Sequence, residues 1–320
     1  MKTDAQFPPV VARDHGGGLD AAVARYGGTR ADWIDLSTGI NPVPYPLPDF
    51  TTSDWTALPD SAARFALIDA ARRFWQVPAG AQIVAASGAS ALIARMPDLA
   101  TGTRVQITAP TYNEHAAAFR ARRWSVIESG QADARVLVHP NNPDGRIWAA
   151  PDLTAPLSII DESFCDVMPD RSLIAQSVNP GVIVLKSFGK FWGLAGARLG
   201  FAIGAPDLID TLTESLGPWP VAGPTLRLGH AALTDHNWAD ATQARLAVDA
   251  DCLDTLMTRR GATLAGGTSL FRLYSVPDAA AWQDRLAQAH IWSRIFPYSD
   301  TLLRLGLPAP DHWPRLEAAV

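Results

Sequence analysis

The sequence predicts an α/β protein, with a large domain on a mostly parallel sheet followed by a smaller α+β domain. From about residue 81 to 204, short and nearly continuous apolar runs alternate with helical or loop segments. Such runs are typical of strands buried on both faces, in sheets that bind ligands at the carboxyl ends of their strands. The 320 residues, 48% hydrophobic and 18% charged, suffice for this core and exclude a disordered or fibrous chain.

Local patterns predict the elements of the large domain. Four prolines within residues 41–48 exclude a helix or a central strand there, so we expect a connector. The predicted strands span residues 104–108, 136–139, 157–161, 182–187 and 199–203, and the predicted helices span residues 60–75, 89–99 and 113–123. Asp60 or Ser61 caps the first helix, and Pro97 ends the second one early. The apolar face of the first helix is expected to consist of Phe65, Ile68, Ala71 and Phe74.

The C-terminal third predicts a smaller mixed domain. A long helical stretch over residues 225–260 has a break near residues 235–237, where turn-forming residues gather. The expected elements after it are a strand at 270–276, a helix at 279–289, a strand at 302–305 and a helix from about Pro310. We therefore divide the chain into an N-terminal arm and connector (1–48), a large domain (49–216) and a small domain (217–320).

Composition excludes several classes of function. A net charge of -5 argues against a nucleic-acid partner, which requires clustered basic residues. No stretch approaches the ~18 apolar residues of a membrane span, and residues 1–13 lack the pattern of a signal peptide, so we expect no membrane partner and a cytoplasmic location. Cys165 and Cys252 are far apart and in no C-x-x-C motif, which predicts buried thiols and neither a disulfide framework nor a metal site.

The basic residues are distributed unevenly, with 24 arginines and three lysines: Lys2, Lys186 and Lys190. Arginine holds an anion but does not readily lose its proton, whereas lysine can become a nucleophilic amine. We expect Lys186 to be a strand-end residue near a bound phosphate, and Lys2 to lie in a loose terminus. Lys190 is the candidate for chemistry.

The segment 182–200 surrounds Lys190 with a recognisable pattern. A buried strand ends at Ser187, and a glycine-rich loop then presents Lys190 and Arg198. The S-x-x-K spacing also occurs in penicillin-binding proteins and β-lactamases, but their S-D-N and K-T-G elements are absent, as are G-x-S-x-G and G-x-G-x-x-G. The segment resembles the Schiff-base lysine motif of the fold type I pyridoxal-phosphate (PLP) enzymes. This resemblance implies that Lys190 bonds to the cofactor and that Ser187 and Arg198 bind its phosphate.

Further stretches follow in the order of that family. At a strand-to-helix turn, the amides of Gly88 and Ala89 would face an anion. The resemblance implies that Tyr112 stacks on the pyridine ring and that Asn142 binds the phenolic oxygen. Read alone, these two residues fit an ordinary loop aromatic and an Asn-Pro turn.

Two charged residues complete the resemblance. Asp161 ends an apolar strand, where a carboxylate is costly without a partner, and it resembles the aspartate that pairs with the pyridinium nitrogen. Arg304 resembles the arginine that clamps the substrate carboxylate. The family pattern is broken where Phe164 replaces a tyrosine three residues after Asp161, and where Leu58 replaces the tyrosine before Pro-Asp. The two losses bear on how tightly phosphate and cofactor are held.

The N-terminal segment narrows the family. Residues 14–17, 26–27 and 34–42 resemble the H-G-G … D-x-S-x-x-I-N-P opening of the threonine-phosphate decarboxylases of cobalamin biosynthesis, which are relatives of the histidinol-phosphate aminotransferases. The resemblance implies decarboxylation of L-threonine O-3-phosphate to (R)-1-amino-2-propanol phosphate by a homodimer. Its implied substrate-binding residues are Arg304, Asn41, His15 and Arg294. An aminotransferase of the histidinol-phosphate type and a non-catalytic binding or scaffold protein with the PLP fold remain the alternatives.

Overall fold

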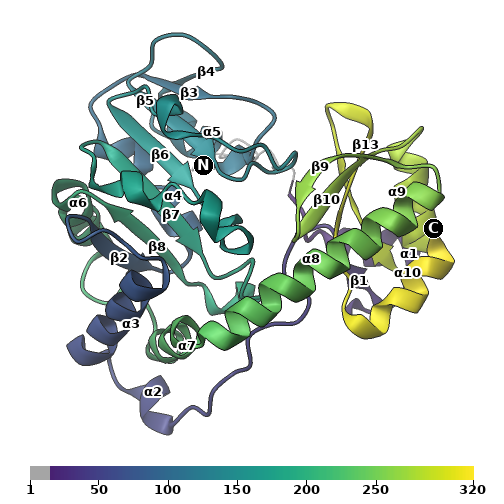
Figure 1. The fold of residues 1–320 in the computed structure, drawn as a ribbon, viewed down its shortest axis with the longest axis horizontal. Coiled ribbons are helices and arrows are strands. Elements are labelled where there is room, and N and C mark those ends of the chain that lie inside the picture. Colours follow the sequence, from purple (N-terminus) through teal and green to yellow (C-terminus); the bar gives the residue numbers. More distant parts are fainter. Residues whose placement is uncertain (1–14) are drawn as a thin grey trace, which may run out of the picture.

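A computed structural model describes residues 15–320 as two neighbouring parts that are bridged by one long helix (Figure 1). The larger part surrounds a seven-stranded sheet, and the smaller part surrounds a four-stranded antiparallel sheet. Residues 1–14, including Lys2 and Asp14, lie outside the described residues. Within the described part, no helix is long and apolar enough to cross a membrane.

The large sheet has the strand order β2-β8-β7-β6-β5-β3-β4. Its strands are β2 (Gln82–Ala86), β3 (Arg104–Ile107), β4 (Ser125–Ile127), β5 (Ala134–Val138), β6 (Leu157–Asp161), β7 (Val182–Ser187) and β8 (Gly200–Gly204). Only β8 runs against its neighbours, and all other pairs in the sheet are parallel. The prediction of a mostly parallel sheet is confirmed.

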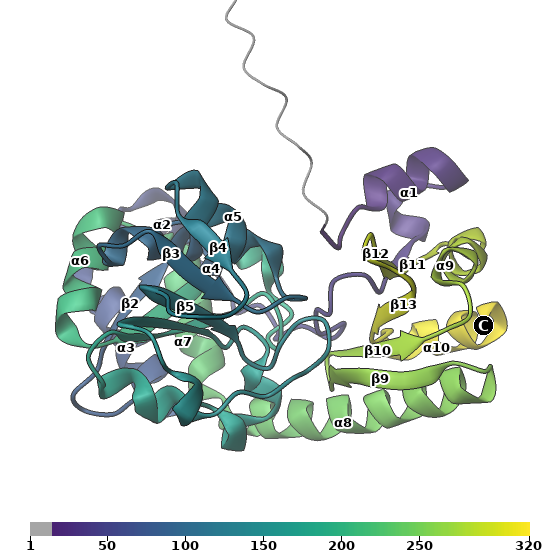
Figure 2. The same ribbon diagram turned by 90° about the horizontal axis from the view of Figure 1, so that it is seen from above.

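Helices cover both faces of this sheet, as the view from above shows (Figure 2). Alternate residues of β7 enter two different cores, with Val182 and Val184 in one and Ile183 and Leu185 in the other. The helices are α3 (Ser61–Phe74), α4 (Ala89–Ile93), α5 (Asn113–Ala121), α6 (Pro206–Leu216) and α7 (Gly223–Thr234), with the short α2 (Thr52–Thr56) before them. Because both faces are covered, the sheet is accessible to ligands only at its strand ends.

Helix α3 shows where the sequence reading was right and where it was wrong. Asp60 caps the helix, accepting a hydrogen bond from the backbone N–H of Ala63 at 2.7 Å. The predicted apolar face is confirmed at Ala71, Ile68 and Phe74, which face the core. It is wrong at Phe65, which is 62% exposed, and it omitted the fully buried Leu67. The buried residues of α3 are Leu67, Ala70 and Ala71.

The smaller part combines both ends of the described chain. Its four-stranded sheet contains β9 (Thr263–Thr268), β10 (Phe271–Ser275), β12 (Arg294–Phe296) and β13 (Ser299–Gly306), with α9 (Ala279–Gln288) and α10 (Trp313–Ala319) beside it. Near the N-terminus, α1 (Leu19–Tyr26) packs by α9, and β1 (Ile34–Asp35) pairs with β11 (Ile291–Trp292) in parallel. The connector 41–48 contains neither helix nor strand, as expected.

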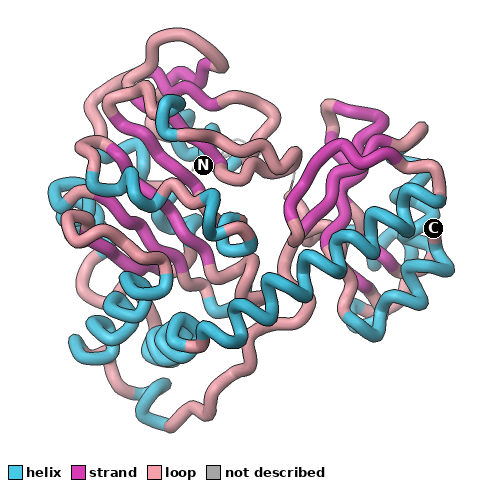
Figure 3. Tube along the Cα trace, in the orientation of Figure 1, coloured by secondary structure: helices cyan, strands magenta, loops and turns pink. Residues whose placement is uncertain are grey.

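Helix α8 (His236–Arg259) links the two parts (Figure 1). The predicted break lies at Asp235, whose side chain caps α8 by accepting from Trp238 N–H at 3.0 Å. Helix α7, before the break, packs on α3 in the large part. The domain limits at 49–216 and 217–320 stay a prediction. Loops that leave the large sheet gather between the two sheets (Figure 3).

Candidate active site

A cavity of about 1240 Å³ lies where the loops after β3, β5 and β7 face the smaller part. Its lining includes six of the residues expected at the site: His15, Tyr112, Asn142, Lys190, Arg294 and Arg304. Ligand pockets usually measure roughly 300–1,000 Å³, so this volume can take a cofactor together with a small substrate.

Lys190 lies in the loop after β7, with its side chain at the cavity. Its Nζ donates a hydrogen bond to the Thr38 carbonyl at 3.2 Å and lies 5.1 Å from the centre of the Phe164 ring. Burial, with the nearby Arg304 charge, lowers the pKa of Lys190 to about 8, although Asp161 and Asp35 act in the opposite direction. A neutral, nucleophilic amine is therefore accessible near neutral pH.

Asp161 ends β6 and is 2% exposed. One carboxylate oxygen lies 2.8 Å from His115 Nε2, and the other accepts from the Ser163 hydroxyl at 2.5 Å and its N–H at 3.0 Å. Burial by itself raises the pKa of Asp161, but the His115 contact and the Ser163 hydrogen bonds outweigh it and lower the pKa. The carboxylate is thus held ionised inside the protein, as its proposed pairing with a pyridinium requires.

His115 is a site residue that the sequence reading missed. It lies in the first turns of α5, is fully buried, and points its Nε2 to Asp161. Because an ionised carboxylate only accepts hydrogen bonds, Nε2 carries the proton in this contact. The available signal was the position of His115 three residues after Tyr112, at the start of a helix that follows a strand of the sheet.

The glycine-rich turn before α4 meets the segment that precedes β8. Gly88 has a φ of +86°, and a Cβ there would lie 2.5 Å from Arg198 Nη2. Gly200 also approaches closely, since its Cβ would lie 2.3 Å from the backbone nitrogen of Ala89. The fold therefore brings Gly88, Ala89 and Arg198 together, as the phosphate-binding prediction requires. Ser187 ends β7, and its hydroxyl accepts from Gly189 N–H at 3.3 Å.

Arg304 connects the small sheet to the cavity. It lies on β13, is 4% exposed, and donates hydrogen bonds to the Asn142 side-chain oxygen and to the Ser37 carbonyl. Its guanidinium carbon lies 5.3 Å from the centre of the Phe271 ring. These contacts fix a cation beside Asn142, in a position suited to a substrate carboxylate.

His15, Tyr112 and Arg294 also line this cavity. His15 Nε2 is 2.9 Å from Glu114 Oε1, and the His15 ring centre is 6.2 Å from that of Tyr112. Asn41, in contrast, is not among the lining residues, and its side chain is 2% exposed. Asn41 donates to the Phe191 carbonyl at 2.8 Å, so the structure places it behind Lys190 rather than at the substrate.

The two positions where the family pattern is broken differ in burial. Phe164 is 4% exposed and packs edge-to-face on Phe271, with ring centres 4.9 Å apart. The Lys190 amine also lies over the Phe164 ring. Leu58 is 68% exposed.

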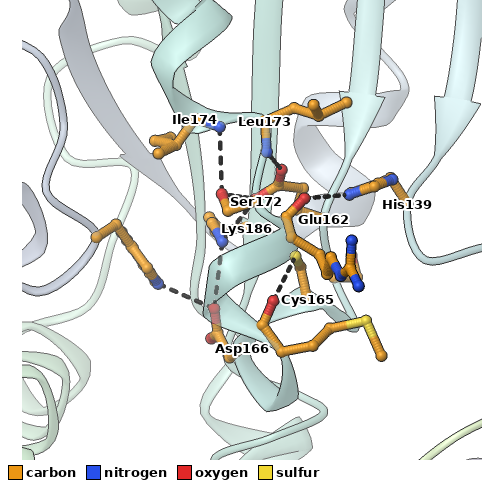
Figure 4. A network of polar contacts seen from close by, with 12 residues as sticks. His139, Glu162, Cys165, Asp166, Ser172, Leu173, Ile174 and Lys186 are labelled. Carbon is orange, nitrogen blue, oxygen red and sulfur yellow. Dashed lines mark hydrogen bonds and ion pairs between the residues drawn. The ribbon is translucent and has the colours of Figure 1, made fainter. Parts of the chain in front are cut away.

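Lys186 lies near the end of β7 in a buried network with Glu162 and Asp166 (Figure 4). Its Nζ is 2.7 Å from Glu162 Oε2 and 3.3 Å from Asp166 Oδ1. Burial disfavours the ammonium, but the two carboxylates reverse this and raise the pKa of Lys186. Lys186 thus remains an ammonium ion, and its expected place near a phosphate is wrong.

His139, Glu162 and Cys165 form a cluster of donor atoms that lie within 4.8 Å of one another (Figure 4). His139 Nδ1 accepts from Trp148 N–H at 3.0 Å, so its Nε2 carries the proton and donates to the Arg171 carbonyl at 2.7 Å. Neither ring nitrogen keeps a lone pair for a metal.

The other two members of this cluster are also engaged. The Glu162 oxygens accept from Leu173 N–H at 2.6 Å and from Ser172 at 2.7 Å. Burial raises the pKa of the Cys165 thiol well above its usual value, which disfavours the thiolate that binds metals. The donor set therefore fits a hydrogen-bonded network. Cys252 is exposed, which corrects its expected burial.

The mostly parallel sheet carries a desolvated lysine and a buried, ionised aspartate at the carboxyl ends of its strands. This arrangement is that of an α/β enzyme with a reactive lysine. The chain belongs to the aminotransferase class I and II family, whose sequence model matches residues 32–312. Threonine-phosphate decarboxylase of Pseudomonas aeruginosa is 40% identical over 96% of this chain and 97% of its own length. An enzyme of the same name from Sinorhizobium sp is 39% identical over 93% of each chain.

Solved structures show the same fold at low sequence identity. The histidinol-phosphate aminotransferase of Sinorhizobium meliloti, in complex with pyridoxal-5'-phosphate, superposes with a TM-score of 0.82. It is 18% identical and covers 98% of this chain and 96% of its own. The L-threonine-O-3-phosphate decarboxylase of Porphyromonas gingivalis has a TM-score of 0.70 at 18% identity, over 83% of this chain and 93% of its own.

Proposed function

We propose that this protein is a PLP-dependent decarboxylase that converts L-threonine O-3-phosphate to (R)-1-amino-2-propanol phosphate in cobalamin biosynthesis. The observation that carries the proposal is the placement of Lys190, Asn142 and Arg304 around one cavity. Two relatives with this activity in their names, each covering more than nine-tenths of the chain, support the choice of reaction. A cytoplasmic location is part of the proposal.

The residues present fit the cofactor. The amine of Lys190 reaches the cavity, and Asp161 provides a buried carboxylate within electrostatic range of it. At Gly88 a side chain would collide with Arg198, which leaves a backbone cradle beside a guanidinium, as a phosphate requires. When bound, PLP would supply a ring that accepts the electron pair released at the substrate Cα.

The chain's own residues would bind and orient the substrate and return a proton to it. Arg304 would bind the substrate carboxylate and so help to orient the bonds at the substrate Cα. Lys190, whose pKa is about 8, could donate a proton to Cα after CO2 has left. Asp161 would pair with the protonated pyridine nitrogen of the bound cofactor.

His15 and Arg294 are the proposed ligands of the substrate phosphate. Both line the same cavity as Asn142, Lys190 and Arg304. A ring N–H of His15 and the guanidinium of Arg294 can donate hydrogen bonds to the oxygens of a phosphomonoester. They would account for a preference for phosphorylated substrates.

Incubation of the PLP-loaded enzyme with L-threonine O-3-phosphate tests the proposal. We expect CO2 release without formation of a keto acid, and loss of both turnover and the visible absorbance band in Lys190→Ala. Glutamate formation that depends on 2-oxoglutarate would instead identify an aminotransferase. A wild-type protein with neither the absorbance band nor turnover would point to the non-catalytic binding or scaffold protein.

A further inference from the structure

Residues 37–41, here called the strap, cross the site and contact Lys190 at both ends of that residue. The Thr38 carbonyl accepts from Lys190 Nζ at 3.2 Å, and Asn41 N–H donates to the Lys190 carbonyl at 3.0 Å. Asn41 Nδ2 donates to the next carbonyl, that of Phe191, at 2.8 Å. One buried asparagine therefore satisfies two consecutive carbonyls of the lysine loop.

The orientation of the Asn41 amide is fixed by its other partners. Its Oδ1 accepts from Arg245 Nη2 at 2.6 Å and from Val43 N–H at 3.0 Å. Both partners are donors only, so the oxygen must face them and the amino group must face Phe191. Arg245, together with the Val43 N–H, thereby holds Asn41 in the orientation that donates to the lysine loop.

Arg245 connects the bridging helix α8 to the strap through its hydrogen bond to Asn41. It lies on α8, and its Nη1 is 2.9 Å from Asp249 Oδ2, one turn further along the same helix. Asp249, Arg245 and Asn41 form a continuous polar chain from the helix that links the two parts to the loop that carries Lys190.

We propose that Asn41 and Arg245 are positioning residues that hold the backbone of Lys190, and through it the amine, at a fixed depth in the cavity. The inference rests on the proposed function, because it takes Lys190 as the reactive lysine. Asn41 then acts without touching the substrate, in place of the substrate contact expected from the sequence. A misplacement of about 1 Å in a reacting group can cost roughly 100-fold in rate, so such support has a measurable effect.

The test measures how the reactivity of the Lys190 amine depends on pH. It uses the full-length apoprotein, so the result does not depend on how much cofactor is bound. The chain has three lysines, so acetic anhydride labelling at Lys190 can be followed by mass spectrometry with Lys2 as internal reference. In the wild type, we expect the labelling rate to reach half its maximum near pH 8. The charges that act on Lys190 are those of Arg304, Asp161, Asp35 and Arg198, and the variants below leave all four in place.

Asn41→Ala and Arg245→Met should both raise that midpoint by about one pH unit, because an amine freed from its fixed position regains hydration. The matched controls are Asn237→Ala and Arg259→Met, two exposed positions on the same helix α8, which should leave the midpoint unchanged. Arg245→Lys keeps a donor and should restore most of the wild-type midpoint. In the PLP-loaded enzyme, both test variants should lower kcat roughly 10- to 100-fold with KM changed less than about threefold.

An unchanged midpoint in both test variants would overturn the proposal, as would a raised KM with unchanged kcat, which indicates a substrate contact. If Asn41→Ala does not fold, as judged by circular dichroism, the partly exposed Arg245→Met decides alone. A wild type that does not act on threonine phosphate but shows the expected shifts would refute the proposed function while supporting the positioning role.

Discussion

Lys186 and Lys190 lie four residues apart, yet their surroundings shift their pKa values in opposite directions. Two carboxylates stabilise the ammonium of Lys186 and raise its pKa, whereas burial beside Arg304 lowers that of Lys190. A nucleophile must be able to lose its proton, so only Lys190 is suited to covalent chemistry. Lys186 instead neutralises charge in the core.

At the residue scale, we expect Lys186→Met to be strongly destabilising. Glu162 and Asp166 would stay buried without their cation, and removing one partner of a buried ion pair costs about 3–5 kcal/mol. Burial raises the pKa of Asp166, and loss of the Lys186 ammonium would raise it further above the unfolded value, so the folded state binds more protons and the defect should shrink as the pH falls. Urea unfolding at pH 7 and pH 5 measures both effects.

A double variant, Lys186→Met with Asp166→Asn, provides the control for charge. It removes one of the uncompensated carboxylates, so it should be more stable at pH 7 than the single variant. Equal stability of wild type and Lys186→Met would contradict the assigned role of the network.

The sequence identified the residues that carry a motif and missed those that only support them. Lys190 and Asp161 could be predicted because each stands in a recognisable local pattern. His115 and Arg245 support them from helices far along the chain, and neither stands in such a pattern. Asn41 was singled out by the N-terminal motif, but only the fold shows that its side chain faces the lysine loop.

At the scale of elements, the turn between β2 and α4 is built for close approach. Its Gly88 has a positive φ, and Arg198 occupies the space that a side chain would need. Gly88→Ala should therefore displace the guanidinium and weaken PLP binding by about 10- to 100-fold, the equivalent of one charge-assisted hydrogen bond. Spectroscopic titration of the apoprotein with PLP measures this affinity.

Gly196→Ala is the matched control for that substitution. It lies two residues before Arg198, and a Cβ at Gly196 would have no atom within 4 Å. Its PLP affinity should equal that of the wild type. Equal affinities for all three proteins would show that the turn does not hold the phosphate.

A strand could be predicted where its sequence pattern matched the way its side chains pack in the fold. Five strands of the large sheet, β3, β5, β6, β7 and β8, were recognised from their mainly apolar runs, because helices cover both faces of the sheet. The short edge strand β4 was not predicted. Strand β9 was missed, since it contains Gly266 and Gly267, which weaken a strand pattern. Both glycines instead allow the backbone to approach Asp144. Gly267 N–H donates to the Asp144 carbonyl at 3.0 Å, and a Cβ at Gly266 would collide with the same carbonyl oxygen.

At the scale of the whole molecule, exposed aromatic residues support the expected homodimer. Phe65 and Trp219 are 62% and 55% exposed and line one groove of about 420 Å³, close in sequence to the exposed Leu58. Burial of such a surface between two copies would stabilise a dimer. Phe65→Glu with Trp219→Glu should halve the mass measured by light scattering, whereas Val248→Glu, 62% exposed on α8, should not. A wild-type monomer would refute the expectation.

The alternation of strands and helices predicted the mostly parallel fold. It did not predict which segments of the chain form the smaller part. Sequence reading treated the N-terminal residues as an arm, whereas α1 and β1 pack with elements near the opposite end of the chain. Pairing over such a separation depends on shape and register, which local patterns do not contain.

The pairing of β1 with β11 also sets the order in which the protein can be completed on the ribosome. Strands β2 to β8 follow one another in the chain, so the large part has all its strands once Gly204 has been synthesised. Ile34 and Asp35 must wait for Ile291 and Trp292, which are synthesised much later. The strap follows directly after β1, so the lysine loop receives its final support only after the strands of the large part are complete.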